Sequence, residues 1–386
     1  MKKKLLALTT LSAVAVANAV EIENPVVKKL YEKGIITEQE AVKLDENLHK
    51  EKSKITGKFE KIKFGGLDYI GYTYKNAKGG TDEGNFEIRR GYFITKFYFN
   101  KKDYARFTFD VTTHNHKDKA KEGKEMNVKI KHLYLYKDIS SIIPATGFEI
   151  GMVHTPWLDY EEHAGWWERS ISKTFYESSD GAHLLPSADA GLEFKTKTEY
   201  LSAEYGIFNG EGYDHLGRND KGNSGNKPSI EGRITWHILG GGTKHLHPEK
   251  DIYANLSLHA VNSFKHRGSN KNLRIYQIHA VYNQPLFLIA GQYIKSNWYS
   301  GAEEKGNGYS VNFEIRPILN HKISFFGRYD SWNSDDNTKD RKQYIYGVAW
   351  KMNKHIKWLI NGIIADYKNN NKKDYTKYMI TAEVSF

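Results

Sequence analysis

The stretch YTKYMITAEVSF (375–386) alternates in side-chain character and predicts a β-strand. Five apolar side chains share one parity, and the polar ones share the other: Tyr378, Ile380, Ala382, Val384 and Phe386 against Thr381, Glu383 and Ser385. Because successive side chains of a strand point to opposite faces, the strand has one apolar and one polar face. A soluble sheet would bury the apolar face, whereas a membrane barrel would turn it toward lipid and line a lumen with the other.

The same alternation recurs from residue 64 onward, in segments separated by turn-forming residues. It is clearest at 309–317, where Tyr309, Val311 and Phe313 oppose Ser310 and Asn312. The strands expected are 64–75, 86–100, 104–113, 128–137, 148–154, 190–196, 200–208, 230–239, 252–262, 273–283, 286–295, 309–317, 323–332, 344–351, 356–367 and 375–386. A set of about sixteen is even, and its size is typical of a barrel with a water-filled lumen.

The connections between these segments alternate in length. The short ones are 100–103, 283–285, 318–321 and 353–354. The longer ones, rich in Gly, Asn, Asp and Lys, are 114–125, 209–227, 297–306, 333–341 and 368–373. Short turns on one rim and long loops on the other are typical of bacterial outer-membrane barrels, and a soluble sandwich has no reason for this regularity. The pattern predicts an all-β fold, a transmembrane antiparallel barrel over 64–386.

Composition supports a barrel over a helical membrane protein. The 386 residues are only 39% hydrophobic but include 26 Tyr, 18 Phe and 8 Trp, and the mean hydropathy is -0.66. A membrane-spanning helix needs ~20 apolar residues in a row, whereas half of each barrel strand is polar. The absence of cysteine excludes disulfides and thiol chemistry. The net charge of +11 favours a lumen that attracts anions, or contact with acidic lipopolysaccharide, over nucleic acid.

Residues 1–63 differ from the strand-rich part. Residues 1–19 have the features of a secretory signal peptide: a Lys2–Lys4 start, an apolar run and an Ala17-Asn18-Ala19 cleavage site. The alternative is an N-terminal anchor helix. In 20–63, Asn24-Pro25 predicts one helix start, and a capping box from Thr37 to Glu40 predicts a second. We interpret this segment as a short periplasmic helical hairpin followed by a charged linker over 50–63. A partial plug or a trimer contact is the alternative.

One connection, residues 155–187, is far longer than the others. A connection of this length inside a compact unit is usually functional. It is rich in tryptophan and charge, and its candidate constriction residues are Trp157, Asp159, Glu161, Glu162, Trp167, Glu168, Arg169 and Lys173. We expect it to narrow the barrel from inside. An aromatic surface loop at a subunit interface is the alternative.

Three segments, FEIRRGYFITKFYF (86–99), YARFTFDVT (104–112) and GFEIGMVHTPW (147–157), resemble the phosphate-selective porin O and P family of Gram-negative outer membranes. The terminal Phe386 likewise resembles the end of the closing strand of such barrels. The resemblance implies a sixteen-stranded homotrimeric channel in the outer membrane, with its third external loop in the lumen and phosphate-binding Arg and Lys along it.

Parity predicts which charged side chains face the lumen. Five are basic: Arg90, Arg106, Arg233, Arg316 and Arg328. Guanidinium groups suit phosphate oxygens. Six carboxylates share the inward parity, namely Asp110, Glu193, Glu204, Glu231, Glu314 and Asp330. A lumen of mixed sign predicts a transverse field and modest selectivity, so phosphate specificity is not expected.

These features predict a passive diffusion channel for small hydrophilic solutes and ions, with a mild preference for anions. A barrel adhesin or structural protein that acts through its loops is the alternative. No catalytic activity or cofactor is expected, because Ser257 and His259 merely share a strand face and no nucleophile-elbow motif is present. His114-x-His116 and His245-x-His247 lack a nearby third ligand, which favours solvated loop residues over a metal site.

Overall fold

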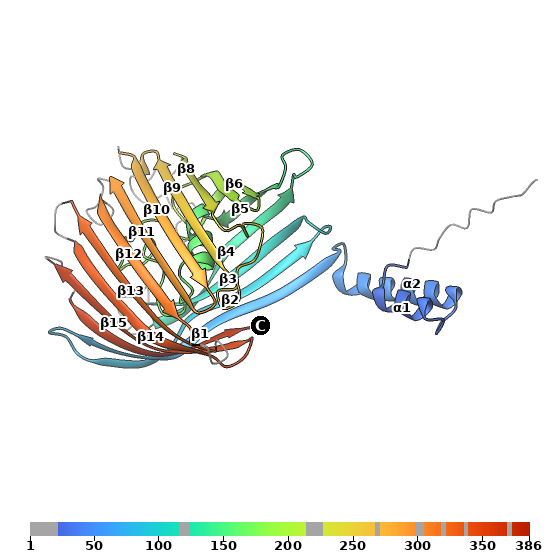
Figure 1. Ribbon diagram of the computed structural model, residues 1–386, viewed down its shortest axis with the longest axis horizontal. Coiled ribbons are helices and arrows are strands. Elements are labelled where there is room, and N and C mark those ends of the chain that lie inside the picture. The colour runs from blue at the N-terminus through green and yellow to red at the C-terminus, as the bar shows by residue number, and fades with distance from the viewer. Residues whose placement is uncertain are drawn as a thin grey trace, which may run out of the picture. The chain divides into compact units, whose positions relative to one another are not determined.

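The structure is a computed structural model that describes residues 22–115, 124–213, 227–266, 271–297, 305–317, 322–335, 339–368 and 373–386. Within these ranges, sixteen strands form a closed antiparallel barrel (Figure 1). Their bounds are β1 Lys61–Ala77, β2 Glu83–Tyr98, β3 Tyr104–Asn115, β4 Lys124–Asp138, β5 Thr146–His154, β6 Ala188–Lys197, β7 Leu201–Phe208, β8 Ser229–His237, β9 Tyr253–Ser263, β10 Leu273–Gln284, β11 Phe287–Asn297, β12 Lys305–Ile315, β13 Ile323–Ser334, β14 Asp340–Lys351, β15 Ile356–Lys368 and β16 Tyr375–Ser385. The predicted fold class is confirmed.

Each strand pairs with its neighbours in sequence, and β16 returns to β1. The closing ladder runs from Leu67 opposite Ser385 to Ala77 opposite Tyr375. Closure removes both sheet edges, so the backbone of every strand finds partners inside the barrel, as hydrocarbon requires.

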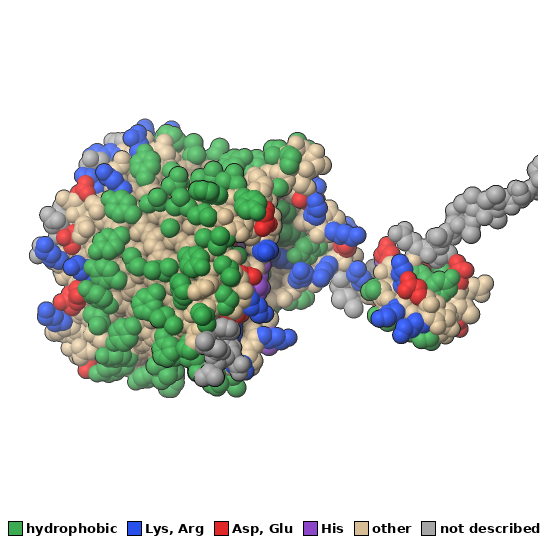
Figure 2. Space-filling model, viewed as in Figure 1, with side chains coloured by type: hydrophobic (Ala, Val, Ile, Leu, Met, Phe, Trp, Pro, Cys, Tyr) green, Lys and Arg blue, Asp and Glu red, His purple; other side chains and the backbone are tan. Residues whose placement is uncertain are grey.

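The two faces of the wall differ as the alternation predicts. On β8, Ile230, Ile234 and Trp236 are exposed on the outer face, whereas Glu231 and Arg233 are buried toward the inside. On β16, Tyr378 and Ile380 point outward and Thr381 points inward. Figure 2 shows hydrophobic side chains spread over the visible outer surface of the barrel, with most charged side chains near its margins. This outer surface suits lipid.

Two β-bulges break the alternation on the inner wall. The β1–β2 register shifts between Tyr69 and Ile70, so Arg89 has no directly opposite partner. The β3–β4 register shifts between Thr108 and Phe109, and Lys131 is skipped in the same way. A bulge inserts one extra residue, so two adjacent side chains can share a face.

The connections differ in one respect from the expected rule. The rim that carries the C-terminus has short turns at 198–200 and 285–286, but it also carries the long connection 238–252 between β8 and β9. The middle of this connection lies against the barrel interior, where Leu246 packs on buried side chains. The prediction that this rim has only short turns is therefore wrong at one position.

Residues 22–60 form a separate unit with two helices, α1 (Pro25–Glu32) and α2 (Glu38–Thr56). The Asn24 side chain caps α1, and Thr37 and Glu40 form the expected capping box. Val27 and Ala41 are buried in this unit. The expected linker over 50–63 is wrong at both ends, because α2 continues to Thr56 and β1 already begins at Lys61.

Among the described residues, no helix is long and apolar enough to cross a membrane. The expected signal peptide, residues 1–19, lies outside the described residues.

Candidate functional site

The long connection 155–187, called the insert below, lies inside the barrel. It begins with helix α3 (Pro156–Ala164), which has Pro at its first turn and ends at Gly165. Proline suits this position because its missing N–H has no helical partner there. Figure 1 shows α3 enclosed by the strands, and the contacts described next confirm that position.

The start of the insert is fixed to β8, β9 and β10. Arg233 Nε of β8 donates to the Pro156 carbonyl at 2.8 Å. The Trp157 ring is fully buried, and its centroid lies 5.4 Å from those of His259 on β9 and His279 on β10. Trp157 Nε1 donates to Glu161 Oε2 at 2.7 Å. Trp157 and Glu161 thus anchor the insert to the wall and contribute little to a water-facing surface.

The middle of the insert is fixed to β13 and β15. Arg328 of β13 stacks over Trp166, with its Cζ 4.3 Å from the ring centroid, and its Nη1 donates to the Lys173 carbonyl at 2.9 Å. Its partner Asp330 lies 2.9 Å away. On β15, Lys357 Nζ lies 3.1 Å from a carboxylate oxygen of Glu168. These charges are buried but paired, as low-polarity surroundings require.

Residues 180 and 181 of the insert are fixed to β14, β15 and β16. The Asp180 carboxylate accepts hydrogen bonds from the hydroxyls of Tyr367 and Tyr375, the latter at 2.6 Å. Arg341 of β14 donates to the Gly181 carbonyl. The insert therefore reaches along the inner wall from β8 to β16 and then returns to its starting point, where the Thr155 N–H donates to the Ser187 carbonyl at 3.2 Å.

Apolar packing reinforces these polar contacts. Inner-wall side chains on β9–β11 and β13 form one buried cluster with seven side chains of the insert: Trp157, Leu158, Phe175, Tyr176, Ala182, Leu184 and Leu185. Gly308 on β12 permits this approach, because a Cβ there would lie 2.8 Å from Phe175 Cζ. Trp166 and Ile171 join a second cluster on β13–β16. The inner wall is therefore apolar where the insert covers it, which the expectation of a polar lumen face missed.

The insert also carries its own ion-pair cluster. Arg169 lies 2.5 Å from Glu162 and 3.3 Å from Glu177, and Lys173 lies 2.7 Å from Glu177. Arg169 is close enough to Tyr69 and Tyr92, on β1 and β2, for an electrostatic interaction. This cluster thus lies toward the part of the wall formed by the first strands.

The inner wall of β2–β4 is rich in basic side chains. Arg90 forms an ion pair with Asp110, which also accepts from the Tyr213 hydroxyl at 3.0 Å. Arg89, next to it, donates to Thr381 at 2.6 Å and to Thr73 at 3.1 Å. Lys131 Nζ lies 4.8 Å from the Tyr92 ring centroid. Parity identified Arg90 but missed Arg89 and Lys131, because the two bulges change which residues face inward.

A second charged cluster surrounds Lys195 on β6. Its Nζ lies 3.1 to 3.7 Å from four carboxylates, those of Glu149, Asp159, Glu193 and Glu204. Nearby, Arg106 Nη1 lies 3.1 Å from His154 Nε2. The structure thus brings Asp159 of the insert beside Arg106 and the wall acids. Lys195 shares the inward parity of Glu193, so the sequence contained the signal that would have identified it.

The remaining predicted residues lie apart from these clusters. Arg316 lies at the short-turn rim and pairs with Glu314 at 2.9 Å. Trp167 lies near the same rim, where its Nε1 is 3.4 Å from the Tyr253 hydroxyl. Ser257 and His259 face inward but bond to separate partners, Thr235 and Glu231. His116 lies outside the described residues, and His245 and His247 lie on the 238–252 connection.

The structure is a closed sixteen-stranded barrel with the insert inside it, and comparison with known proteins finds the same barrel fold. The anion-selective porin from Comamonas acidovorans resembles it with a TM-score of 0.59 and 12% sequence identity, over 84% of this chain and 99% of that one. Pseudomonas putida OprB has a TM-score of 0.59 and 10% identity, over 89% of this chain and 97% of that one. Salmonella typhi OmpF in complex with daunomycin has a TM-score of 0.57 and 12% identity, over 84% of this chain and 97% of that one. No protein-family model and no curated protein matches the sequence. The fold is that of bacterial outer-membrane porins, which supports a location in the outer membrane, and the apolar outer surface of the barrel suits lipid. The resemblance to the phosphate-selective family stays a prediction.

Proposed function

We propose that this protein is a passive diffusion channel for small hydrophilic solutes and ions across the outer membrane. The observation that carries the proposal is the insert, which is fixed to the inner wall from β8 to β16 by paired charges and apolar packing. An insert held in this way narrows the lumen without a covalent link, and it leaves the charged wall of β2–β4 as the lining of a water path.

The same wall supports a mild anion preference. Five cations lie on β2–β4, namely Arg89, Arg90, Lys96, Arg106 and Lys131, and the acids near them are Glu87, Asp110, Glu149 and Asp159. A lining of one predominant sign raises the local concentration of oppositely charged solutes. Because most of these cations have partners, the preference is expected to be mild, without specificity for phosphate.

Planar-bilayer recording of the purified full-length protein tests this function. Stepwise conductance and a reversal potential of anionic sign in a salt gradient are expected. Deleting residues 159–175 should raise the single-channel conductance, because the constriction is lost. No stepwise current would refute the channel and favour the alternative, a barrel that acts through its external loops. A cationic reversal potential would refute the proposed sign alone.

We also propose that the protein is a homotrimer in contact with lipopolysaccharide. The homotrimer rests on the family resemblance. The contact with lipopolysaccharide rests on the basic net charge of +11 beside an apolar outer surface. The mass of the detergent-solubilised protein, measured by light scattering, tests the oligomer. A monomeric mass would refute it.

A further inference from the structure

The connection 238–252 has features that set it apart from the other turns on its rim. It leaves β8 through Gly240 and Gly241, whose φ values of 77° and 95° favour glycine. Glu199 of the neighbouring turn holds this bend, because its Oε1 accepts from Gly241 N at 2.7 Å and its carbonyl from Gly242 N at 2.9 Å. The bend is therefore built into the fold.

Beyond the bend, the connection packs against the inner wall and the insert. Leu246 lies on a buried cluster that includes Tyr253, Val281 and Leu288, and Trp167 of the insert packs on the same cluster. The ring of His245 lies 6.4 Å, centroid to centroid, from that of His163 at the end of α3. The connection thus contacts the insert from the side of the short-turn rim.

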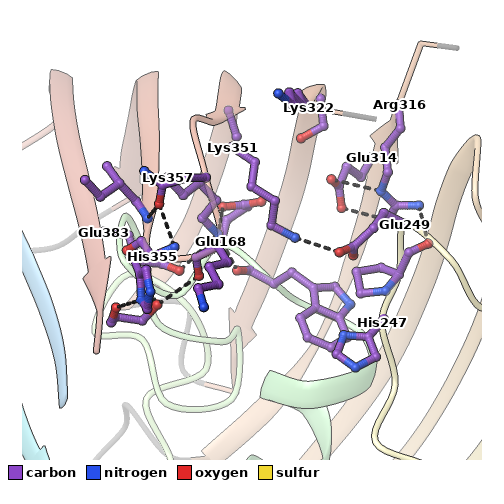
Figure 3. A pocket seen from close by; sticks show the side chains of 18 of the residues that line it. Glu168, His247, Glu249, Glu314, Arg316, Lys322, Lys351, His355, Lys357 and Glu383 are labelled. Carbon is purple, nitrogen blue, oxygen red and sulfur yellow. Dashed lines mark hydrogen bonds and ion pairs between the residues drawn. The ribbon is translucent and has the colours of Figure 1, made fainter. Parts of the chain in front are cut away.

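The far end of the connection is fastened to strands further round the barrel. The Pro248 carbonyl accepts from Arg316 Nη1 at 3.0 Å and from Asn283 Nδ2 at 2.9 Å. Glu249 Oε1 lies 2.7 Å from Lys351 Nζ on β14, five strands beyond β9 in the barrel order. Figure 3 shows Lys351 extending to Glu249, with Arg316 and Glu314 beside it. The connection therefore crosses part of the mouth of the barrel.

Two cavities flank this crossing. One, of about 270 Å³, lies on the side of β12–β16, and the other, of about 260 Å³, lies on the side of β6–β9. His245 and Leu246 line both. Among the described lining residues, five Lys and Arg face four acids in the first cavity, and three face two in the second. Both cavities are charged and suited to water, with a small excess of positive charge.

We propose that the 238–252 connection is a second constriction in series with the insert. It divides the water path at the short-turn rim into two charged openings, which set the largest solute that passes and add to the preference for anions. Arg316 and Lys351 are positioning residues, because they hold the connection through the Pro248 carbonyl and the Glu249 carboxylate. The inference rests on the proposed channel function.

Three variants test it. In the first, an Asn-Gly turn replaces residues 241–250, which joins β8 and β9 as a short hairpin. The second is Glu249→Gln, which removes the ion pair to Lys351. Its matched control is Asp335→Asn, which removes the pair with Lys305, also 2.7 Å long, on the opposite rim. The third is His247→Cys, whose thiol is unique because the chain has no cysteine.

The shortened variant should show higher single-channel conductance, and liposome swelling should show passage of larger sugars. Glu249→Gln should shift conductance in the same direction, and Asp335→Asn should not. A negatively charged thiol reagent on His247→Cys should reduce anion current, with labelling confirmed by mass. Two results would overturn this inference and leave the channel function intact. One is a shortened variant that conducts with unchanged conductance and an unchanged size limit for solutes. The other is complete labelling of His247→Cys without a change in current. A wild-type protein that does not conduct would overturn both.

Discussion

Phe386 closes the barrel on Gly66. The Gly66 N–H donates to the Phe386 carbonyl at 2.8 Å, and the Phe386 N–H donates back to the Gly66 carbonyl at 3.1 Å. The aromatic ring of Phe386 covers the space that a side chain on Gly66 would need, because a Cβ there would lie 2.1 Å from Cζ of the ring. Phe386, which directly follows β16, and a glycine of β1 are therefore fitted to each other.

Gly66→Ala should weaken this closure. The added methyl group forces the exposed Phe386 ring away, so the ring loses its contact with Gly66 at the closure. The temperature at which the folded barrel loses its faster migration on electrophoresis should fall. Gly65→Ala is the matched control, because its Cβ would lie 3.4 Å from the nearest atom of Phe386. Equal temperatures for the two variants would contradict the fitted pair.

Trp157→Ala should loosen the insert while leaving the barrel closed. Removing a fully buried tryptophan costs about 3–5 kcal/mol, and this cost falls on the contact between the insert and β9–β10. Single-channel recording should show higher and noisier conductance. Trp236→Ala, an exposed tryptophan on the outer face of β8, is the control and should conduct as the wild type does. Equal traces would mean that Trp157 does not hold the insert.

Arg328→Met should destabilise the protein more than the double variant Arg328→Met/Asp330→Leu. The single change leaves the buried Asp330 carboxylate without its cation, which costs roughly 3–5 kcal/mol, whereas replacing both partners by apolar side chains is often neutral. Thermal unfolding, monitored by circular dichroism, shows which of the two variants unfolds at the lower temperature. The reverse order would show that Asp330 stabilises the barrel through contacts other than Arg328, and that its unpaired charge is not the main cost.

Conductance should rise as the solution becomes more acidic. Burial lowers the pKa of His245, and the neighbouring His163, His247 and Lys197 lower it further, whereas Asp251 acts in the opposite direction. The pKa of His245 is therefore lower while the 238–252 connection is packed in place than when the connection is detached from the barrel interior. Protonation of His245 thus favours the detached connection. The change should begin as the pH falls below about 6.5, the ordinary pKa of histidine.

The control for this pH dependence is His245→Gln, which keeps a polar side chain but cannot be protonated. Recordings at neutral and mildly acidic pH should show a smaller rise in this variant. A rise of wild-type size would assign the effect to other groups.

The outward and inward faces of the barrel wall could be predicted from local sequence. The residues that depart from this alternation could not. The alternation at Tyr309–Ile315 and along 375–386 is a property of neighbouring residues, so it assigns the outward and inward faces without knowledge of any partner. The alternation did not identify Arg89 and Lys131 as inward-facing, because a bulge depends on how one strand pairs with the next. Met379 and Leu359 face inward although they are apolar, because the insert covers that part of the wall.

The sequence by itself determined the period of two, the rhythm of the turns and the exceptional length of the insert, because each of these is written in residues close together along the chain. Only the tertiary structure decided that the insert follows the wall from β8 to β16, and that the 238–252 connection turns inward to Lys351. These placements depend on contacts between residues far apart in the chain, such as Arg328 with Trp166 and Glu249 with Lys351, and local patterns carry no information about them.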